Sequence, residues 1–166
     1  EDCLYLNVWT PAQEEGEKLP VIFWVHGGAF MTGYGHSAHF DGEPFARQGV
    51  ILVTINYRLN IFAWMTHPQL SAESENHTSG NYGLLDQVAA LEWTRRNIAA
   101  FGGDPDNITI AGQSAGAMSV QALLTTPLTQ GMVGKAILQS GGGVTAAPDM
   151  RFPTLAQAEG QTDLSL

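Results

Sequence analysis

A serine flanked by glycines at positions 112–116 is the first feature of the sequence that could do chemistry. The segment reads Gly-Gln-Ser-Ala-Gly, and it follows the apolar run Asn-Ile-Thr-Ile-Ala. Glycines on both sides permit a tight strand-to-helix turn that would lift the hydroxyl of Ser114 above the edge of a sheet. The backbone N–H of Ala115, at the start of the helix, would then point at the oxyanion that forms when the hydroxyl attacks a carbonyl carbon. The pattern predicts acyl transfer with Ser114 as the nucleophile.

A second glycine-rich loop, His-Gly-Gly-Ala-Phe at 26–30, follows the apolar run 21–25. Small residues let a backbone approach a substrate oxygen closely, so this loop is predicted to supply the second oxyanion donor. A glycine turn without a ligand and a phosphate cradle are the alternatives, and the lack of a Gly-Lys-Ser/Thr sequence argues against the cradle. Residues 33–38 also match the dinucleotide-binding pattern, but they begin about eight residues after the strand instead of in its first turn. The run 50–56 ends in Asn56, where an acidic residue would bind the ribose, so nucleotide binding is disfavoured.

The general base that Ser114 would need is not evident among the histidines. In enzymes with this serine turn, the acid and the histidine follow the serine along the chain. All five histidines of this sequence precede Ser114, so the carboxylates downstream have no histidine to orient. His26 opens the glycine loop and is predicted to orient that loop. The other four are predicted to lie in surface loops: His36, His39, His67 and His77.

Alternating strands and helices are predicted to position these loops. The buried apolar runs and the helical spacing indicate a mostly parallel sheet with right-handed crossovers, which is an α/β fold. A polar loop is expected over 66–80, and a turn over 104–106. The expected strands are 4–9, 21–25, 50–56, 107–111 and 135–140, the last of them buried, and the expected helices are 41–48, 82–101 and 115–125.

Composition excludes several classes of function. The chain of 166 residues has a formal net charge of −9, which disfavours nucleic acid and anionic membranes as partners. No apolar run reaches the length of about 18 residues that suggests a membrane span. Cys3 is the only cysteine, so a cysteine-based metal cluster and an internal disulfide are both excluded, and nothing indicates a cofactor. The cellular compartment does not follow from these features.

Four blocks of the sequence resemble the type-B carboxylesterases, relatives of the cholinesterases and of bacterial para-nitrobenzyl esterases. They stand in that family's order, and the resemblance extends over about 140 of the 166 residues. The blocks are EDCLYLNV at 1–8, HGGAF at 26–30, GNYGLLDQVAALEW at 80–93 and FGGDPDNITIAGQSAGAMSV at 101–120.

This resemblance implies an α/β-hydrolase fold and the hydrolysis of small-molecule carboxylic esters through an acyl-enzyme intermediate. Residues 1–166 are expected to form a partial domain, an N-terminal-half fragment of a longer enzyme. By resemblance Ser114 is the acylated nucleophile, and the oxyanion donors are Gly28, Ala29 and Ala115. The triad acid and histidine are expected beyond residue 166, so the chain by itself is expected to be inactive.

Two departures from the cholinesterases favour a general esterase of the bacterial type. Gln113 stands where cholinesterases carry Glu, which removes a carboxylate that would attract cationic choline esters. Ala29 replaces the third glycine of their loop but keeps its backbone N–H. A non-catalytic adhesion module of the same fold is the alternative, although such modules typically lose the serine. Two roles remain as alternatives for four further residues, lining of the substrate pocket and packing in the core: Phe30, Met31, Trp64 and Tyr82.

Overall fold

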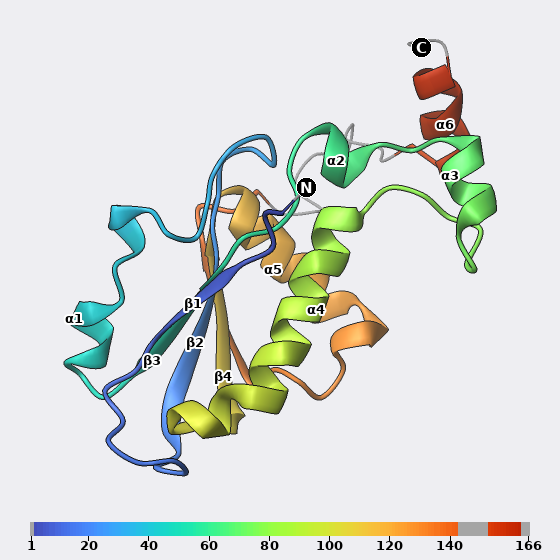
Figure 1. Ribbon diagram of the computed structural model, residues 1–166. Helices are drawn as coiled ribbons and strands as arrows, with labels where there is room; N and C mark the ends of the chain where they lie inside the picture. Colours follow the sequence, from blue (N-terminus) through green and yellow to red (C-terminus); the bar gives the residue numbers. More distant parts are fainter. Residues whose placement is uncertain (1, 143–152, 164–166) are drawn as a thin grey trace.

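A five-stranded sheet forms the centre of the computed structural model, which describes residues 2–142 and 153–163. The strand order is β1-β3-β2-β4-β5, and every neighbouring pair is parallel except β1 and β3. The predicted mostly parallel α/β sheet is confirmed. The strands are β1 (Leu6–Trp9), β2 (Leu19–Val25), β3 (Ile51–Ile55), β4 (Gly103–Gln113) and β5 (Lys135–Gln139) (Figure 1).

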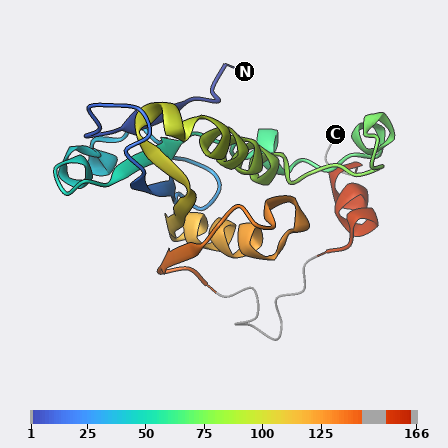
Figure 2. The same cartoon turned by 90° about the horizontal axis from the view of Figure 1, so that it is seen from below.

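The two longest helices, α4 (Tyr82–Asn97) and α5 (Ala115–Thr125), lie side by side in both cartoon views (Figures 1 and 2). The amide of Gln87 on α4 donates a hydrogen bond of 3.1 Å to the hydroxyl of Ser119 on α5, and both side chains are buried. The shorter helices are α1 (Glu43–Ala46), α2 (Ile61–Trp64), α3 (Pro68–Glu73) and α6 (Leu155–Asp163), with 3₁₀ turns η1 (Ala38–Phe40), η2 (Ile98–Phe101) and η3 (Pro127–Thr129).

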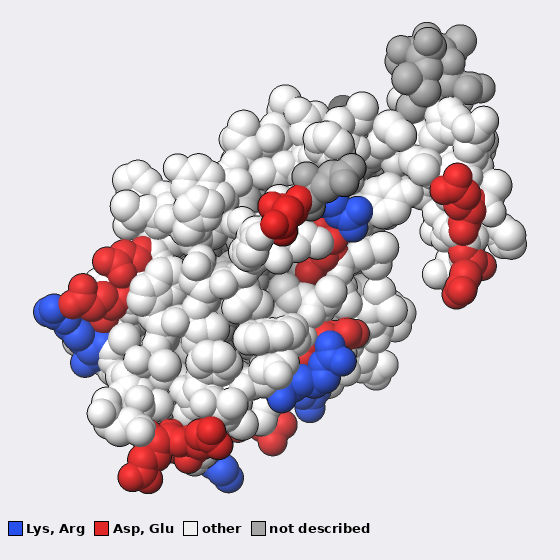
Figure 3. Space-filling model, viewed as in Figure 1, with Lys and Arg blue, Asp and Glu red and all other residues white. Residues whose placement is uncertain are grey.

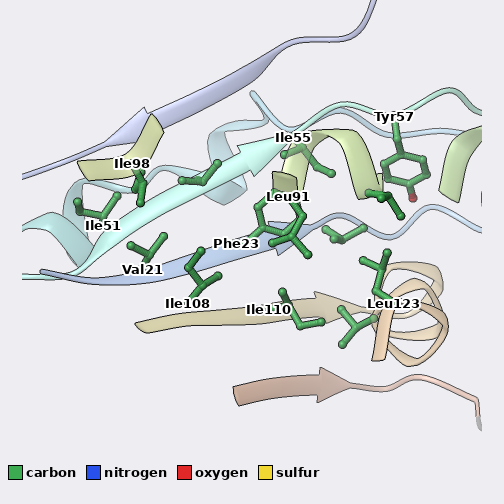
Figure 4. Packing of buried hydrophobic residues seen from close by; sticks show 14 residues of the cluster. Val21, Phe23, Ile51, Ile55, Tyr57, Leu91, Ile98, Ile108, Ile110 and Leu123 are labelled. Atoms are coloured by element: carbon green, nitrogen blue, oxygen red, sulfur yellow. The ribbon is translucent and has the colours of Figure 1, made fainter. Parts of the chain in front are cut away.

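The main core lies between the central strands and these two helices. Every second residue of β2, β3 and β4 faces this side, as the alternation of side chains along a strand requires. Leu91 of α4 and Leu123 of α5 close the core from the helix side (Figure 4). The buried cluster includes Val21, Phe23, Val25, Ile51, Val53, Ile55, Tyr57, Leu91, Ile98, Ile108, Ile110 and Leu123.

The opposite face of the sheet is covered by the segment that contains η1 and α1. The ring of Trp24 on β2 lies 5.6 Å from the ring of Phe40. A Cβ added to Gly42 would lie 2.5 Å from the indole of Trp9, so only a glycine lets this segment approach so closely. Cover on both faces leaves all five residues of β3 buried, as expected for a strand inside a mostly parallel sheet.

Three expectations from the sequence need correction. The segment 66–80 is not all loop, because α3 begins at Pro68, where His67 caps it by accepting a hydrogen bond from the N–H of Gln69. The strand β5 is not buried, and all five of its residues are exposed. The predicted turn at 104–106 lies inside β4, where the pairing with β2 is irregular.

Charged side chains form small mixed groups on the surface. On the face that Figure 3 shows, the basic side chains lie near acidic ones, and no broad basic patch appears. Among the described residues, no helix is long and apolar enough to cross a bilayer.

Candidate active site at the ends of β2 and β4

Ser114 lies at the junction between β4 and α5 in a strained backbone conformation. Its φ of 54° and ψ of −122° are rarely adopted by residues other than glycine. The N–H of Ser114 donates to the carbonyl of Gln139 on β5 at 2.8 Å, and its own carbonyl accepts from the N–H of Met118 at 3.1 Å. The sharp turn predicted from the glycine-flanked serine is therefore present.

The two glycines of the motif are needed for close packing. A Cβ on Gly112 would lie 2.5 Å from backbone atoms of Gly116. A Cβ on Gly116 would lie 2.1 Å from the carbonyl oxygen of Val25, at the end of β2. The start of α5 thus rests directly on the backbone of β2, which fixes the height of Ser114 above the sheet.

The glycine loop 26–30 meets Ser114 because β2 and β4 are neighbours. Val25 pairs with Gly112, so the chain leaves both strands at the same level. A Cβ on Gly27 would lie 2.7 Å from the carbonyl oxygen of Gln113 and 3.2 Å from the Cβ of Ser114. Two segments about 85 residues apart in the sequence are brought into contact at this point.

The carbonyl groups of the glycine loop are held by hydrogen bonds. The N–H groups of Met31 and Thr32 donate to the carbonyl of Gly28 at 3.0 and 3.1 Å. The carbonyl of Phe30 accepts from the N–H of Asn60 at 2.8 Å and from the indole of Trp64 at 3.2 Å. These hydrogen bonds anchor the loop through the carbonyl groups of Gly28 and Phe30.

The predicted donor groups are two backbone N–H groups of the glycine loop and that of the first residue of α5. In the part of the chain that the structure describes, no group accepts a hydrogen bond from the backbone N–H of Gly28, Ala29 or Ala115. Gly28 has a φ of +113°, which glycine adopts without strain, whereas the φ of 55° at Ala29 strains an alanine. Such strain is typical of loops that are shaped to bind a ligand.

His26 is buried at the base of the loop, with only 1% of its surface exposed. Its Nδ1 lies 2.7 Å from the carbonyl oxygen of Gly27, and its ring stacks on Tyr57 at a centroid distance of 4.5 Å. The hydroxyl of Tyr57 donates to the carbonyl of His26 at 2.8 Å. Burial lowers the pKa of His26 below its usual value, although the hydrogen bond to Gly27 acts in the opposite direction. Burial therefore favours the neutral form of the ring.

Arg58, the residue after Tyr57, forms a half-buried ion pair with Asp86. The guanidinium of Arg58 donates to both carboxylate oxygens of Asp86 on α4, at 2.8 and 2.7 Å, and the backbone N–H of Arg58 adds a third bond at 2.9 Å. This pairing ties the segment that follows β3, which contains Tyr57, to α4. Tyr57 was not singled out by the sequence, although its place just after the apolar run 50–56 puts it at the same sheet edge.

An apolar pocket of about 520 Å³ opens beside Ala29. The rings of Phe30 and Trp64 meet edge to face on its wall, with centroids 5.0 Å apart. Tyr82 does not line this pocket, since it contacts Arg58 in a separate depression next to α3. The lining side chains include Phe30, Met31, Ile61, Trp64 and Met65.

None of the five histidines is a partner of Ser114. In the described ranges, which contain all five, no hydrogen bond links an imidazole to the hydroxyl of Ser114. The described residues also include no group of three or more metal-ligating side chains.

Comparison with known proteins identifies the family. The sequence matches the family model described as the carboxylesterase family over residues 1–156. It is 51% identical over 142 residues to a fumonisin B1 esterase of Sphingopyxis macrogoltabida, an alignment that covers 86% of this chain and 26% of the relative. It is 50% identical over 157 residues to a para-nitrobenzyl esterase of Bacillus subtilis, covering 94% of this chain and 31% of the relative.

Solved structures agree with this assignment. A carboxylesterase of Geobacillus stearothermophilus, EST55, superposes with a TM-score of 0.80 at 55% identity, over 86% of this chain and 30% of that protein. A thermophilic para-nitrobenzyl esterase superposes with a TM-score of 0.82 at 45% identity, over 98% of this chain and 31% of that protein. The chain thus spans less than a third of the length of these relatives. It belongs to the carboxylesterase family, and its sheet is part of an α/β-hydrolase fold.

Proposed function

We propose that this chain carries the nucleophile and the oxyanion hole of a serine esterase that cleaves small-molecule carboxylic esters. The hydroxyl of Ser114 attacks the ester carbonyl carbon, the alcohol leaves, and water then hydrolyses the acyl-Ser114 ester. The observation that carries the proposal is the strained Ser114 at the β4–α5 turn with Gly27 packed against it. The similarity of the chain to a fumonisin B1 esterase and to a para-nitrobenzyl esterase supports it.

The oxyanion hole in this proposal consists of the backbone N–H groups of Gly28, Ala29 and Ala115. Within the described structure these groups have no acceptor, and they lie on the two segments that meet at Ser114. Ala115 also begins α5, so the positive end of the helix dipole faces the developing negative charge. Preformed donors of this kind stabilise the tetrahedral intermediate without reorganisation during the reaction.

The pocket beside Ala29 favours an uncharged, apolar substituent on the ester. Aromatic and aliphatic side chains such as Phe30 and Trp64 make most of its lining, and the polar residues there are uncharged: Asn60, Thr66 and Gln161. Position 113, next to the nucleophile, is a neutral Gln. A cationic alcohol such as choline would therefore find no carboxylate from this position, and a neutral ester is the expected substrate class.

The proton of Ser114 must go to a base that lies outside the five histidines described here. A hydroxyl without an adjacent base is a weak nucleophile. We therefore expect the full-length enzyme to supply a histidine and an acid to this site, and we expect the 166-residue chain alone to show no turnover.

A fluorophosphonate probe tests the proposal directly. We expect the full-length protein to react with the probe, and peptide mapping by mass spectrometry to locate the adduct on Ser114. Prior incubation with a short para-nitrophenyl ester should slow the labelling. A full-length protein that binds esters but is never labelled, and never hydrolyses them, would instead be a non-catalytic binding module.

Replacement of Gly28 by alanine tests the oxyanion hole. A Cβ at this position would lie 2.0 Å from the carbonyl oxygen of Thr32, and the φ of +113° is unfavourable for alanine, so the loop must move. Misplacing one donor should lower kcat for a para-nitrophenyl ester by about 100-fold with little change in KM.

Gly49→Ala is the matched control for Gly28→Ala. Gly49 also has a positive φ, +76°, but its added Cβ would meet nothing within 4 Å. We expect this variant to lose about 1 kcal/mol of stability and to keep its kcat. Equal losses of kcat in the two variants would show that strain, and not a donor, explains the effect of Gly28→Ala.

A further inference from the structure

The proposed donors of the glycine loop belong to two consecutive peptide groups, and the structure holds these groups differently. In a trans peptide the C=O and N–H bonds point in opposite directions, so an anchor on the carbonyl sets the direction of the N–H. The carbonyl of Gly28 is held by the N–H groups of Met31 and Thr32, and this sets the N–H of Ala29. The loop therefore holds the second donor by its own backbone.

The other peptide group, between Gly27 and Gly28, depends on a side chain. In the described part of the chain, the only group that donates to the carbonyl of Gly27 is the imidazole of His26, at 2.7 Å. Because a carbonyl oxygen can only accept, the donor must be the Nδ1–H of the ring. The N–H of Gly28, on the opposite side of this peptide, has no acceptor among the described residues.

We propose that His26 is a positioning residue of the oxyanion hole: its Nδ1–H holds the Gly27 carbonyl and thereby aims the N–H of Gly28 at the substrate oxygen. This inference rests on the proposed function, because it assigns a role within the same site. It is distinct from acid–base chemistry, since no hydrogen bond in the described structure joins the ring to the hydroxyl of Ser114.

The surroundings of His26 fix the ring in one orientation. Tyr57 stacks on one face at 4.5 Å, and its hydroxyl holds the carbonyl of the same histidine. A Cβ on Gly33 would lie 2.5 Å from Nδ1 and 2.8 Å from the carbonyl oxygen of Gly27. Gly33 thus packs over the hydrogen bond itself and leaves no room for water to replace either partner.

The unused nitrogen of the ring supports this assignment. The Nε2 atom of His26 is buried and has no partner among the described residues. In the neutral ring with a proton on Nδ1, Nε2 carries only a lone pair, whereas the opposite tautomer would bury an unpaired N–H and lose the bond to Gly27. The environment therefore selects the tautomer that donates to the loop.

Two variants of nearly equal polarity separate positioning from packing. The side-chain nitrogen of Asn lies as many bonds from Cα as Nδ1, whereas the nitrogen of Gln corresponds to Nε2. In the full-length protein we expect His26→Asn to retain kcat for a para-nitrophenyl ester within about threefold. We expect His26→Gln and His26→Leu to lower kcat by about 10- to 100-fold with KM nearly unchanged.

Thermal melts and probe labelling of the same proteins decide between the outcomes. Equal kcat values for the Asn and Gln variants, or kcat losses that simply follow the losses in melting temperature, would overturn the positioning role. A rise in KM at constant kcat would also overturn it, because positioning acts in the transition state. Labelling of wild-type Ser114 is read separately: if it fails, the proposed function fails, whatever the His26 variants show.

Discussion

Ser114→Ala is expected to lower kcat for a short para-nitrophenyl ester by about 10⁴-fold or more in the full-length protein. The residues of a nucleophile–base unit act together, so the loss of the hydroxyl leaves only the rate enhancement due to binding and the oxyanion hole. Hydrolysis followed at saturating ester, with the protein concentration fixed by active-site titration of the wild type, measures the effect. Retention of more than about a hundredth of the wild-type kcat would mean that another residue is the nucleophile.

Two further variants complete this experiment. Ser119→Ala, in α5, removes a buried hydroxyl that accepts a hydrogen bond from Gln87, so it should cost about 1 kcal/mol of stability and leave kcat unchanged.

Ser114→Gly should be as inactive as Ser114→Ala but more stable by about 1 kcal/mol, because glycine adopts positive φ without strain. Urea unfolding of the three variants tests this ordering. Equal stability of the Ala and Gly variants would show that the backbone at Ser114 stores no strain.

Gly116→Ala is expected to damage both the fold and the activity. The added Cβ would lie 2.1 Å from the carbonyl oxygen of Val25 and 2.8 Å from that of His26, and both atoms are backbone. Neither can move aside without shifting the end of β2 or the start of α5. We expect a loss of about 3 kcal/mol in the free energy of unfolding and a kcat at least about 100-fold lower, because the shift would separate Ser114 from the oxyanion donors.

Gly134→Ala provides the control for this substitution. Gly134 immediately precedes β5, and an added Cβ would meet nothing within 4 Å. We expect its stability to stay within about 0.5 kcal/mol of the wild type and its kcat to be unchanged. Urea unfolding monitored by tryptophan fluorescence, with kcat measured on the same samples, compares the two glycines. A Gly116→Ala protein as stable as Gly134→Ala would contradict the packing of α5 on β2.

The α/β class and most elements could be predicted from the sequence because the apolar periodicity of each segment agrees with its final structure. The helix at 115–125 was predicted to the residue, since Ser114 and Pro127 bound it clearly. The helix α3 was missed because its sequence is polar and short, and it begins at a proline capped by a histidine side chain. Local propensity is weak evidence at this length.

The burial of β5 was predicted wrongly for a different reason. An apolar run reports that a strand is suited to burial, but burial itself requires another element to cover it. In the described part of the chain, the side chains of Ile137 and Leu138 remain 43% and 40% exposed.

The candidate site shows a similar limit. The motif at 112–116 and the loop at 26–30 could be recognised from glycine spacing, and the pairing of β2 with β4 brings them together. The bond from His26 to the Gly27 carbonyl could not be read from the sequence, because it depends on the ring stack with Tyr57, more than 30 residues away. The catalytic roles of Ser114, Gly28, Ala29 and Ala115 stay predictions until the variants are measured.

The link between Ser114 and β5 has a consequence for the dynamics of the nucleophile. Strands β2 and β4 each pair on both sides, whereas β5 pairs with β4 alone in the described ranges and exposes every side chain. Amide hydrogen exchange should therefore be slow in β2 and β4 and much faster along β5, since strands with few buried contacts open at low free energy. The N–H of Ser114 bonds to the carbonyl of Gln139 on that strand. Each local opening of β5 breaks this backbone hydrogen bond of Ser114. A change that stabilises β5, and so slows its amide exchange, is therefore expected to narrow the range of positions that the Ser114 hydroxyl visits.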